Sequence, residues 1–214
     1  QNTTFSSARG DLFNFVDNAA SGSADDLIFN NNTLSNNHPA IATGGGGVTI
    51  SSNGTKDFTF HIDTNTMRDA VGHGILFVKS TGTASFSGTF TGNSVGVAAT
   101  ANSGSKEGDG IKVQNAGQGT VTMAITGNNI HQYNNFGIEL LTGGGATAQS
   151  GALNATISGN TIDSPGNTAG TLGIAKNGVH LNAGTVVGDT YALCVDIVNN
   201  HLANSGADAV PAVG

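Results

Sequence analysis

Apolar and polar residues alternate in short runs along most of the chain, and glycine or asparagine bounds each run. The segment ATISGNTI, residues 155–162, is typical: Ile157 and Ile162 would face inward, while Thr156 and Ser158 would face solvent. A period of two indicates a β-strand with one buried face, and no long stretch of the sequence shows the helical period. Gly, Asn and Thr are also poor residues for helix interiors. The pattern therefore predicts an all-β fold.

Near-copies of this segment recur along the chain, each with an asparagine followed by a polar and an apolar residue. The aligned positions, 28 to 40 residues apart, are Asn32, Asn65, Asn93, Asn128, Asn160 and Asn200. A second motif, glycine and then an alternating apolar pair, appears as GILF, GIKV, GIEL and GVHL, beginning at Gly74, Gly110, Gly137 and Gly178. Such a unit cannot bury its apolar face alone, but stacked copies bury a continuous core. The repeat predicts a parallel β-solenoid of about six to eight coils.

The spacing between the two motifs predicts where loops enter the coils. It is short after Asn65 and Asn128 and about twice as long after Asn93 and Asn160, so we expect inserted loops near 96–109 and 163–177. The second motif is weaker in the first and last units, which read PAIA at 39–42 and DAVPAV at 208–213. We expect residues 1–214 to form one solenoid domain, which can also be a segment of a longer array.

The alternation also predicts which side chains form the core and which face solvent. The expected core residues are Ile75, Ile111, Ile138, Leu140, Ile157, Ile162, Val179 and Leu181. Between them, Lys112, Glu139 and His180 occupy the outward positions of their strands, where we expect them to be solvated. The single cysteine, Cys194, lies in the apolar run YALCVDIV, and we expect it to be a small buried hydrophobe.

The aligned asparagines are expected at a tight corner between two strands. Such a bend needs a residue with positive φ, which Gly and Asn tolerate best, and glycine precedes the aligned asparagine at Gly92, Gly127 and Gly159. Asparagines of successive coils would stack about 4.8 Å apart and bond one another as a ladder. The alternative is a ligand-binding track along the asparagine row. We prefer the ladder, because the corner alone explains the residue type.

The segments GDGIKVQNAGQGTVTMAITGNNI and GALNATISGNTI resemble the repeats of right-handed parallel β-helix proteins. More narrowly, they resemble repetitive segments of large bacterial surface and secreted proteins, such as autotransporter passengers and β-strand-repeat proteins. The resemblance implies a single-stranded right-handed parallel β-helix at the exterior or cell surface of a bacterium. It specifies function poorly, because one fold hosts many activities.

Charge excludes several classes of function. The net charge is −7 with only seven Lys and Arg residues, which argues against binding to nucleic acid or to anionic membranes. No apolar run approaches the roughly 20 residues of a membrane-spanning helix. Only 10% of the residues are charged, but 37% are apolar and lie in short regular runs, so we expect a folded chain rather than a disordered one.

The candidate chemical residues do not form a recognisable catalytic or metal-binding motif. Glycoside hydrolysis needs two facing carboxylates, and Asp63 and Asp196 are candidates because both precede an asparagine corner. His61 and Asp63 have metal-ligand residue types without a partner motif, so we expect no cofactor; Ca²⁺ is conceivable, but no motif indicates it. An enzyme would be indicated instead if the fold brought at least three of five ionisable residues within side-chain reach of one another. These residues are His61, Asp63, Arg68, Asp69 and Asp196.

We therefore expect a structural extracellular protein rather than an enzyme: a stalk, an adhesin or a fibre subunit that stacks head to tail. Neither end of the sequence shows a capping helix, and open strand edges attract other strands. The expected partners are copies of the same chain or flanking repeats of a longer one. The alternative is a carbohydrate-binding or polysaccharide-degrading β-helix domain, for which surface glycans would be the partner.

Overall fold

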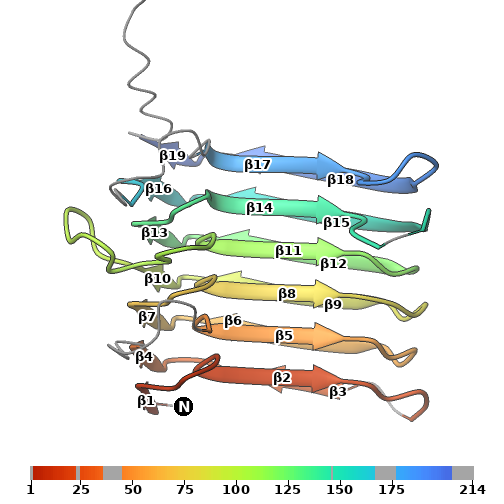
Figure 1. Cartoon of the computed structure of the whole chain (residues 1–214), viewed down its shortest axis with the longest axis horizontal. Coiled ribbons are helices and arrows are strands. Elements are labelled where there is room, and N and C mark those ends of the chain that lie inside the picture. Colours follow the sequence, from red (N-terminus) through yellow and green to blue (C-terminus); the bar gives the residue numbers. More distant parts are fainter. Residues whose placement is uncertain (1, 23–24, 36–44, 146, 167–176, 204–214) are drawn as a thin grey trace, which may run out of the picture.

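The computed structural model describes residues 2–22, 25–35, 45–145, 147–166 and 177–203. In this part of the chain the strands follow one another through three parallel sheets, so that each strand pairs with the third strand before and after it. Figure 1 shows the result as layers stacked in sequence order, from β1 at the N-terminal end to β19 at the other. The predicted parallel β-solenoid is confirmed as a three-sided solenoid with about six coils.

The three sheets differ in strand length. Sheet A, on the short side, contains β1 (Thr4–Ser6), β4 (Thr33–Ser35), β7 (Thr66–Arg68), β10 (Ser94–Val95), β13 (Asn129–His131), β16 (Thr161–Asp163) and β19 (His201–Leu202). Sheet B contains β2 (Phe13–Asp17), β5 (Val48–Ser52), β8 (Ile75–Lys79), β11 (Ile111–Asn115), β14 (Phe136–Thr142) and β17 (Asn177–Ala183). Sheet C contains β3 (Asp25–Ile28), β6 (Phe58–Asp63), β9 (Phe86–Thr91), β12 (Thr120–Thr126), β15 (Ser150–Ser158) and β18 (Thr190–Val198).

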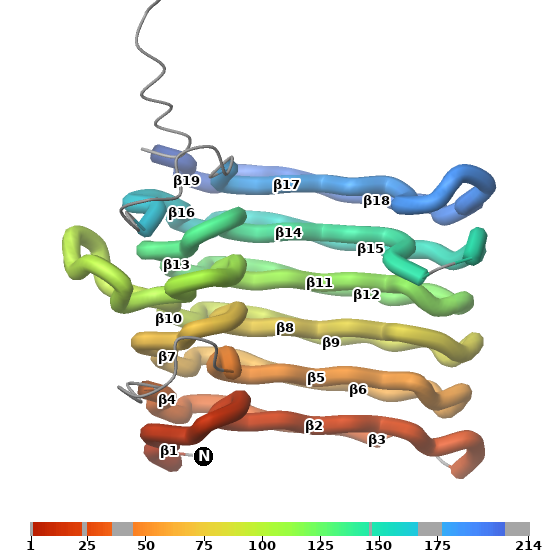
Figure 2. The backbone as a smooth tube through the Cα atoms, viewed as in Figure 1, coloured from red at the N-terminus to blue at the C-terminus, as the bar shows by residue number. Residues whose placement is uncertain are grey.

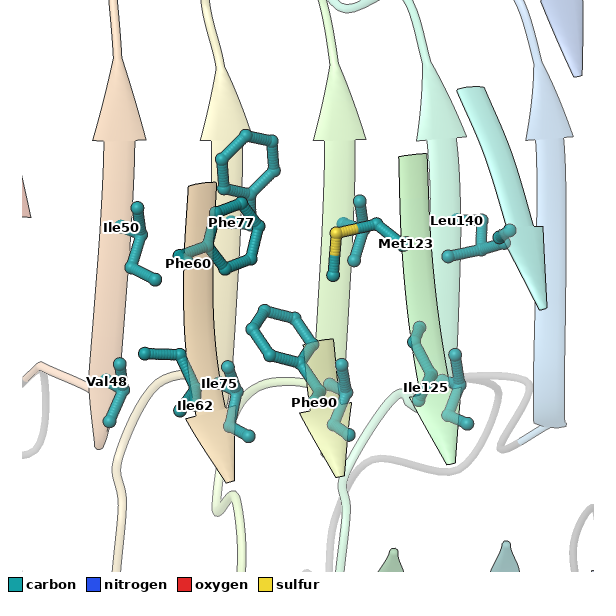
Figure 3. Close-up of a cluster of buried hydrophobic side chains, with 14 of the residues drawn as sticks. Val48, Ile50, Phe60, Ile62, Ile75, Phe77, Phe90, Met123, Ile125 and Leu140 are labelled. Carbon is teal, nitrogen blue, oxygen red and sulfur yellow. The ribbon is translucent and has the colours of Figure 1, made fainter. Parts of the chain in front are cut away.

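The core is built from inward side chains that stack in register along the solenoid axis. In sheet B, for example, Ile75, Ile111 and Ile138 are partners on successive strands. Figure 3 shows such rows from opposite sheets meeting in the interior, with Phe60 and Phe77 facing each other. Their rings stack with centroids 4.8 Å apart. Because the rows are continuous, each coil buries its apolar face only against its neighbours.

Six of the eight predicted core residues are completely buried: Ile75, Ile111, Ile138, Leu140, Ile157 and Ile162. Val179 is partly buried and packs against this cluster. The prediction for Leu181 is wrong, because 40% of this residue is exposed. It occupies the inward register position next to Leu140, but β17 is the last described strand of sheet B.

The corner geometry also differs from the expectation. The positive φ falls on the residue before each aligned asparagine, at Asn31, Thr64, Gly92, Gly127, Gly159 and Asn199, with values of 55° to 65°. The asparagine that follows begins the turn into sheet A and contributes its side chain instead. This explains why glycine precedes three of the six asparagines, since glycine adopts positive φ without steric cost.

The segment 96–109 forms a loop between β10 and β11, and Figure 2 shows it projecting beside β10. The second expected insertion, 163–177, lies largely outside the described residues, as do the weak motifs at 39–42 and 208–213.

Candidate functional site

The aligned asparagines form a hydrogen-bonded ladder inside the corner between sheets C and A. At Asn128, the backbone N–H and the side-chain Nδ2 both donate to Asn160 Oδ1, each over 2.9 Å. Asn128 Nδ2 also donates to the Phe90 carbonyl at 2.7 Å, and Asn128 Oδ1 accepts from the N–H and Nδ2 of Asn93. The same pattern links Asn32 to Asn65, Asn65 to Asn93, and Asn160 to Asn200.

The burial of the asparagine side chains decides whether the row is a structural ladder or a ligand-binding track. Asn32, Asn65, Asn93, Asn128 and Asn160 are each at most 3% exposed. Their carboxamide oxygens accept bonds from the preceding coil and their amides donate to the following one, so few hydrogen-bonding positions are left for another molecule. The row is therefore a structural element that ties each coil to the next, not a track that faces a ligand.

The two ends of the described solenoid present apolar inward positions without a described neighbour. On the C-terminal coil Leu181, Ile197 and Leu202 are 40%, 48% and 44% exposed. At the N-terminal end Phe5, Phe13, Phe15 and Leu27 are partly buried against the core. Edge strands with exposed backbone and apolar side chains are sites where another strand can add.

Ionisable side chains on the outside pair mainly between neighbouring coils. Glu139 Oε2 lies 2.6 Å from Lys112 Nζ, and Glu139 Oε1 lies 3.2 Å from His180 Nδ1. The His180 ring also stacks on Phe136 with centroids 4.1 Å apart. The expectation that Glu139 is solvated is therefore wrong, because these register neighbours cover it and leave it 7% exposed.

A second such pair joins His131 to Asp163, whose Nδ1 and Oδ1 atoms are 2.7 Å apart. Burial acts to raise the pKa of Asp163, but hydrogen bonds from Ser164 and His131 outweigh it and lower that pKa. His73 and Asp109 form a third pair at 3.0 Å. Sequence reasoning missed all three pairs, because they depend on the register between coils of unequal length.

The two candidate catalytic carboxylates do not meet. Asp63 lies on β6 and Asp196 on β18, with β9, β12 and β15 between them in sheet C. They also occupy different register columns, because Asp63 aligns with Thr91 whereas Asp196 aligns with Thr156. The expectation of equivalent positions is wrong, since the two residues precede their ladder asparagines by different distances in the sequence.

The remaining candidates form small local contacts. The Thr89 hydroxyl donates to Asp63 over 2.9 Å and lies 3.0 Å from His61 Nδ1. Asp69 accepts from the Ser35 hydroxyl, and burial lowers the pKa of the adjacent Arg68 guanidinium against the opposing effect of Asp69. Among the described residues, no group of three or more His, Cys, Asp or Glu side chains is arranged to hold a metal ion.

Cys194 is exposed on the outer face of sheet C, so the expectation of burial is wrong. Its register partner on β15 is Asn154, while the neighbouring Leu193 and Val195 take the inward positions against Leu153 and Ala155. In the run YALCVDIV the phase that contains Cys194 also contains Asp196, and the register with β15 places this phase outward.

A lysine is buried at the end of a strand of sheet B, at a position that faces the core. Lys79 is completely buried in register between Ser52 and Asn115. Its ammonium donates to the Thr81 carbonyl over 3.1 Å and lies 4.8 Å from the Phe86 ring centroid. Burial lowers the pKa of Lys79 to about 8, while Asp17 and Asp57 act in the opposite direction.

This lysine predicts a pH dependence of stability. Between about pH 8 and pH 10.4 the unfolded state keeps the Lys79 proton that the folded state has lost, so the free energy of unfolding rises with pH. We expect Lys79→Met to remove this rise, which amounts to at most about 3 kcal/mol. Urea unfolding at pH 7, 8.5 and 10 measures the rise in the free energy of unfolding. Lys106→Met, at a more exposed lysine, is the control and should keep the rise. If the free energy of unfolding of Lys79→Met rose with pH as steeply as that of the wild type, the rise would not come from Lys79.

A polar groove of about 470 Å³ crosses three successive turns between sheets B and C. Its lining carries no charged side chain and consists of Ser80, Thr81, Gly82, Ala116, Gly117, Gln118, Gly145, Thr147 and Gln149. Gln118 Nε2 lies 3.4 Å from Gln149 Oε1 across adjacent turns. The turns become neighbours only when the coils stack, so nothing in the sequence indicated the groove.

No family model, no curated protein and no solved structure matches this chain. In the described part of the chain, no helix is long and apolar enough to cross a membrane.

Proposed function

We propose that this protein is a structural rod of the bacterial exterior, a stalk, adhesin shaft or fibre subunit, that extends by stacking end to end. The observation that carries the proposal is the asparagine ladder, which joins consecutive coils from Asn32 to Asn200. The bacterial and extracellular assignment follows the resemblance of GIKV- and GIEL-type repeats to bacterial surface proteins.

The ladder suits a rod because it couples each coil to both neighbours. Each inner carboxamide bonds to the coils on either side, and the inward rows pack across the same junctions. In a solenoid the stability is a sum of such nearest-neighbour terms, so added coils lengthen the rod without changing its construction. A contact between unlike ends that repeats without closing produces a filament.

The proposal predicts that association depends on the inward positions of the C-terminal coil. Ile197 faces inward on β18 and is 48% exposed, whereas Val198 faces outward on the same strand and is 39% exposed. Sedimentation velocity over a concentration series should show association of the wild type that Ile197→Asp abolishes, because a carboxylate would be buried at the junction. Val198→Asp, the matched control, should associate like the wild type. Equal association of all three proteins would contradict the proposal.

Binding of a neutral glycan is a second candidate function, favoured by the uncharged groove over the turns between sheets B and C. Amides and hydroxyls such as those of Gln118, Thr147 and Gln149 offer both donors and acceptors to sugar hydroxyls. Binding of a neutral oligosaccharide that depends on Gln118 would favour this function.

A further inference from the structure

The outer side of sheet C carries an uncharged grid of small polar residues on β9, β12 and β15, three strands that stack in unbroken register (Figure 1). Three rows of outward register partners cross these strands, each with its middle residue on β12. The rows run from Ser87 to Asn154, from Thr89 to Thr156 and from Thr91 to Ser158. Seven of these nine residues carry a hydroxyl group, and none of the nine is buried. We call them the hydroxyl face.

The same coils carry ionisable side chains on both of their other sides. On sheet B, Lys112 and Glu139 are outward register partners, and on sheet A, His131 is the register partner of Asp163. Within sheet C, the outward acidic residues lie on the flanking strands β3, β6 and β18. The lack of charge is therefore a local property of the hydroxyl face.

The strands hold these hydroxyl groups at nearly fixed positions. Neighbouring strands lie about 4.8 Å apart, and successive outward residues on one strand are about 6.7 Å apart. Threonine adds little freedom of its own, because its branched Cβ restricts χ1. The Thr126 hydroxyl lies 3.4 Å from that of Ser158, and the Thr89 hydroxyl donates to Asp63 over 2.9 Å. The grid is therefore ordered before any partner arrives.

Such a grid fits a partner that is uncharged and that itself repeats at regular intervals. A charged partner would lose water without meeting an opposite charge on the hydroxyl face. A hydroxyl group donates one hydrogen bond and accepts two, so it can take the place of a water molecule at the edge of a hydrogen-bonded lattice. The oxygen atoms on a crystal face of ice repeat at distances of similar size to the spacings of the grid.

We propose that the hydroxyl face binds the surface of ice, with threonine and serine hydroxyls in the positions of lattice water molecules. A crystalline polysaccharide is the other uncharged periodic solid to consider. Sugar rings present an apolar face that packs best on aromatic side chains, and the hydroxyl face contains none. The geometry therefore favours ice.

The size of the hydroxyl face sets the expected strength of binding. Three strands and three rows cover roughly 300 Å², well below the roughly 800 Å² per partner of a stable protein interface. One molecule should therefore bind ice weakly, and stacked copies would gain affinity through multivalency. The inference goes beyond the proposed rod and does not depend on stacking, because one molecule carries the whole face.

Partitioning into slowly grown ice tests the proposal, because a growing crystal excludes solutes that do not bind to it. We expect the wild type to be enriched in the ice severalfold over a non-binding protein of similar size, as quantified on gels. Thr122→Lys combined with Thr156→Lys should abolish the enrichment, because two hydrated charges would keep the lattice away from the grid. Thr33→Lys, at an exposed threonine on sheet A, is the matched control and should partition like the wild type.

Circular dichroism and urea unfolding establish that the three proteins are equally folded before they are compared. Wild-type partitioning no greater than that of the non-binding protein would overturn the proposal, and equal enrichment of all three proteins would overturn its assignment to the hydroxyl face. Binding to crystalline cellulose without enrichment in ice would identify a polysaccharide as the partner instead. Ile197→Asp should keep the wild-type enrichment, so that failure of end-to-end stacking and failure of ice binding are told apart.

Discussion

Asn128→Ala is expected to lower the free energy of unfolding by about 3–5 kcal/mol, the largest effect of any single ladder substitution. Asn128 is completely buried and lies in the middle of the row. Its loss leaves the Phe90 carbonyl and the Asn93 N–H without their partners, and removes the side-chain donor to Asn160 Oδ1, to which only the backbone N–H of residue 128 would then donate. A buried polar group left unpaired costs more than the net value of the bond it made.

The neighbouring Asn129 provides the matched control. It has the same side chain and lies one residue along, but it is exposed and outside the ladder. Asn129→Ala should change the free energy of unfolding by less than about 0.5 kcal/mol. Chemical denaturation of both variants at equal temperature and pH measures the difference. Equal, small effects would show that the ladder adds little to the stability of the solenoid.

The second large effect is expected at Gly88, where the core of sheet C contains no side chain. A Cβ placed on Gly88 would lie 2.2–2.5 Å from ring atoms of Phe60. That ring has no room to retreat, because Phe60 is completely buried and stacks on Phe77 and Phe58. Overpacking of a tight core displaces side chains from their preferred rotamers. Gly88→Ala should therefore lower the free energy of unfolding by about 3 kcal/mol.

A double-mutant cycle separates this packing effect from a change in backbone preference. Phe60→Leu removes the part of the ring that a new Cβ would meet, so Gly88→Ala should cost less in the Phe60→Leu background than in the wild type. Thermal or urea unfolding of the four proteins supplies the cycle. Strict additivity would mean that the cost at Gly88 arises from the backbone and not from contact with Phe60.

The fold was predictable because the asparagine corners and the period of two recur in every unit. Ladder positions such as Asn65 and Asn160 are visible in the sequence as repeats, and the strand phase follows from motifs such as GIKV and GIEL. The conformation of the corner was less visible, because Asn and Gly share a tolerance of positive φ and only the structure shows that Gly127, not Asn128, adopts it.

The expectations that were wrong concern residues whose burial or neighbours depend on the register between coils. Cys194 shares its strand phase with Asp196, and the register with β15 places that phase outward. Glu139 becomes buried only because Lys112 and His180 align with it. Asp63 and Asp196 look equivalent along the sequence but fall into different columns of sheet C. Loops of unequal length between the motifs hide these alignments, so pairs and grooves that span coils could not be derived from single repeats.

Negative-stain electron microscopy over a range of protein concentrations tests whether this solenoid is a rod that lengthens by end-to-end stacking. We expect unbranched filaments of one uniform width whose length grows with concentration, and we expect Ile197→Asp to prevent their formation. Single short rods of constant length at every concentration, in the wild type and the variant alike, would contradict it.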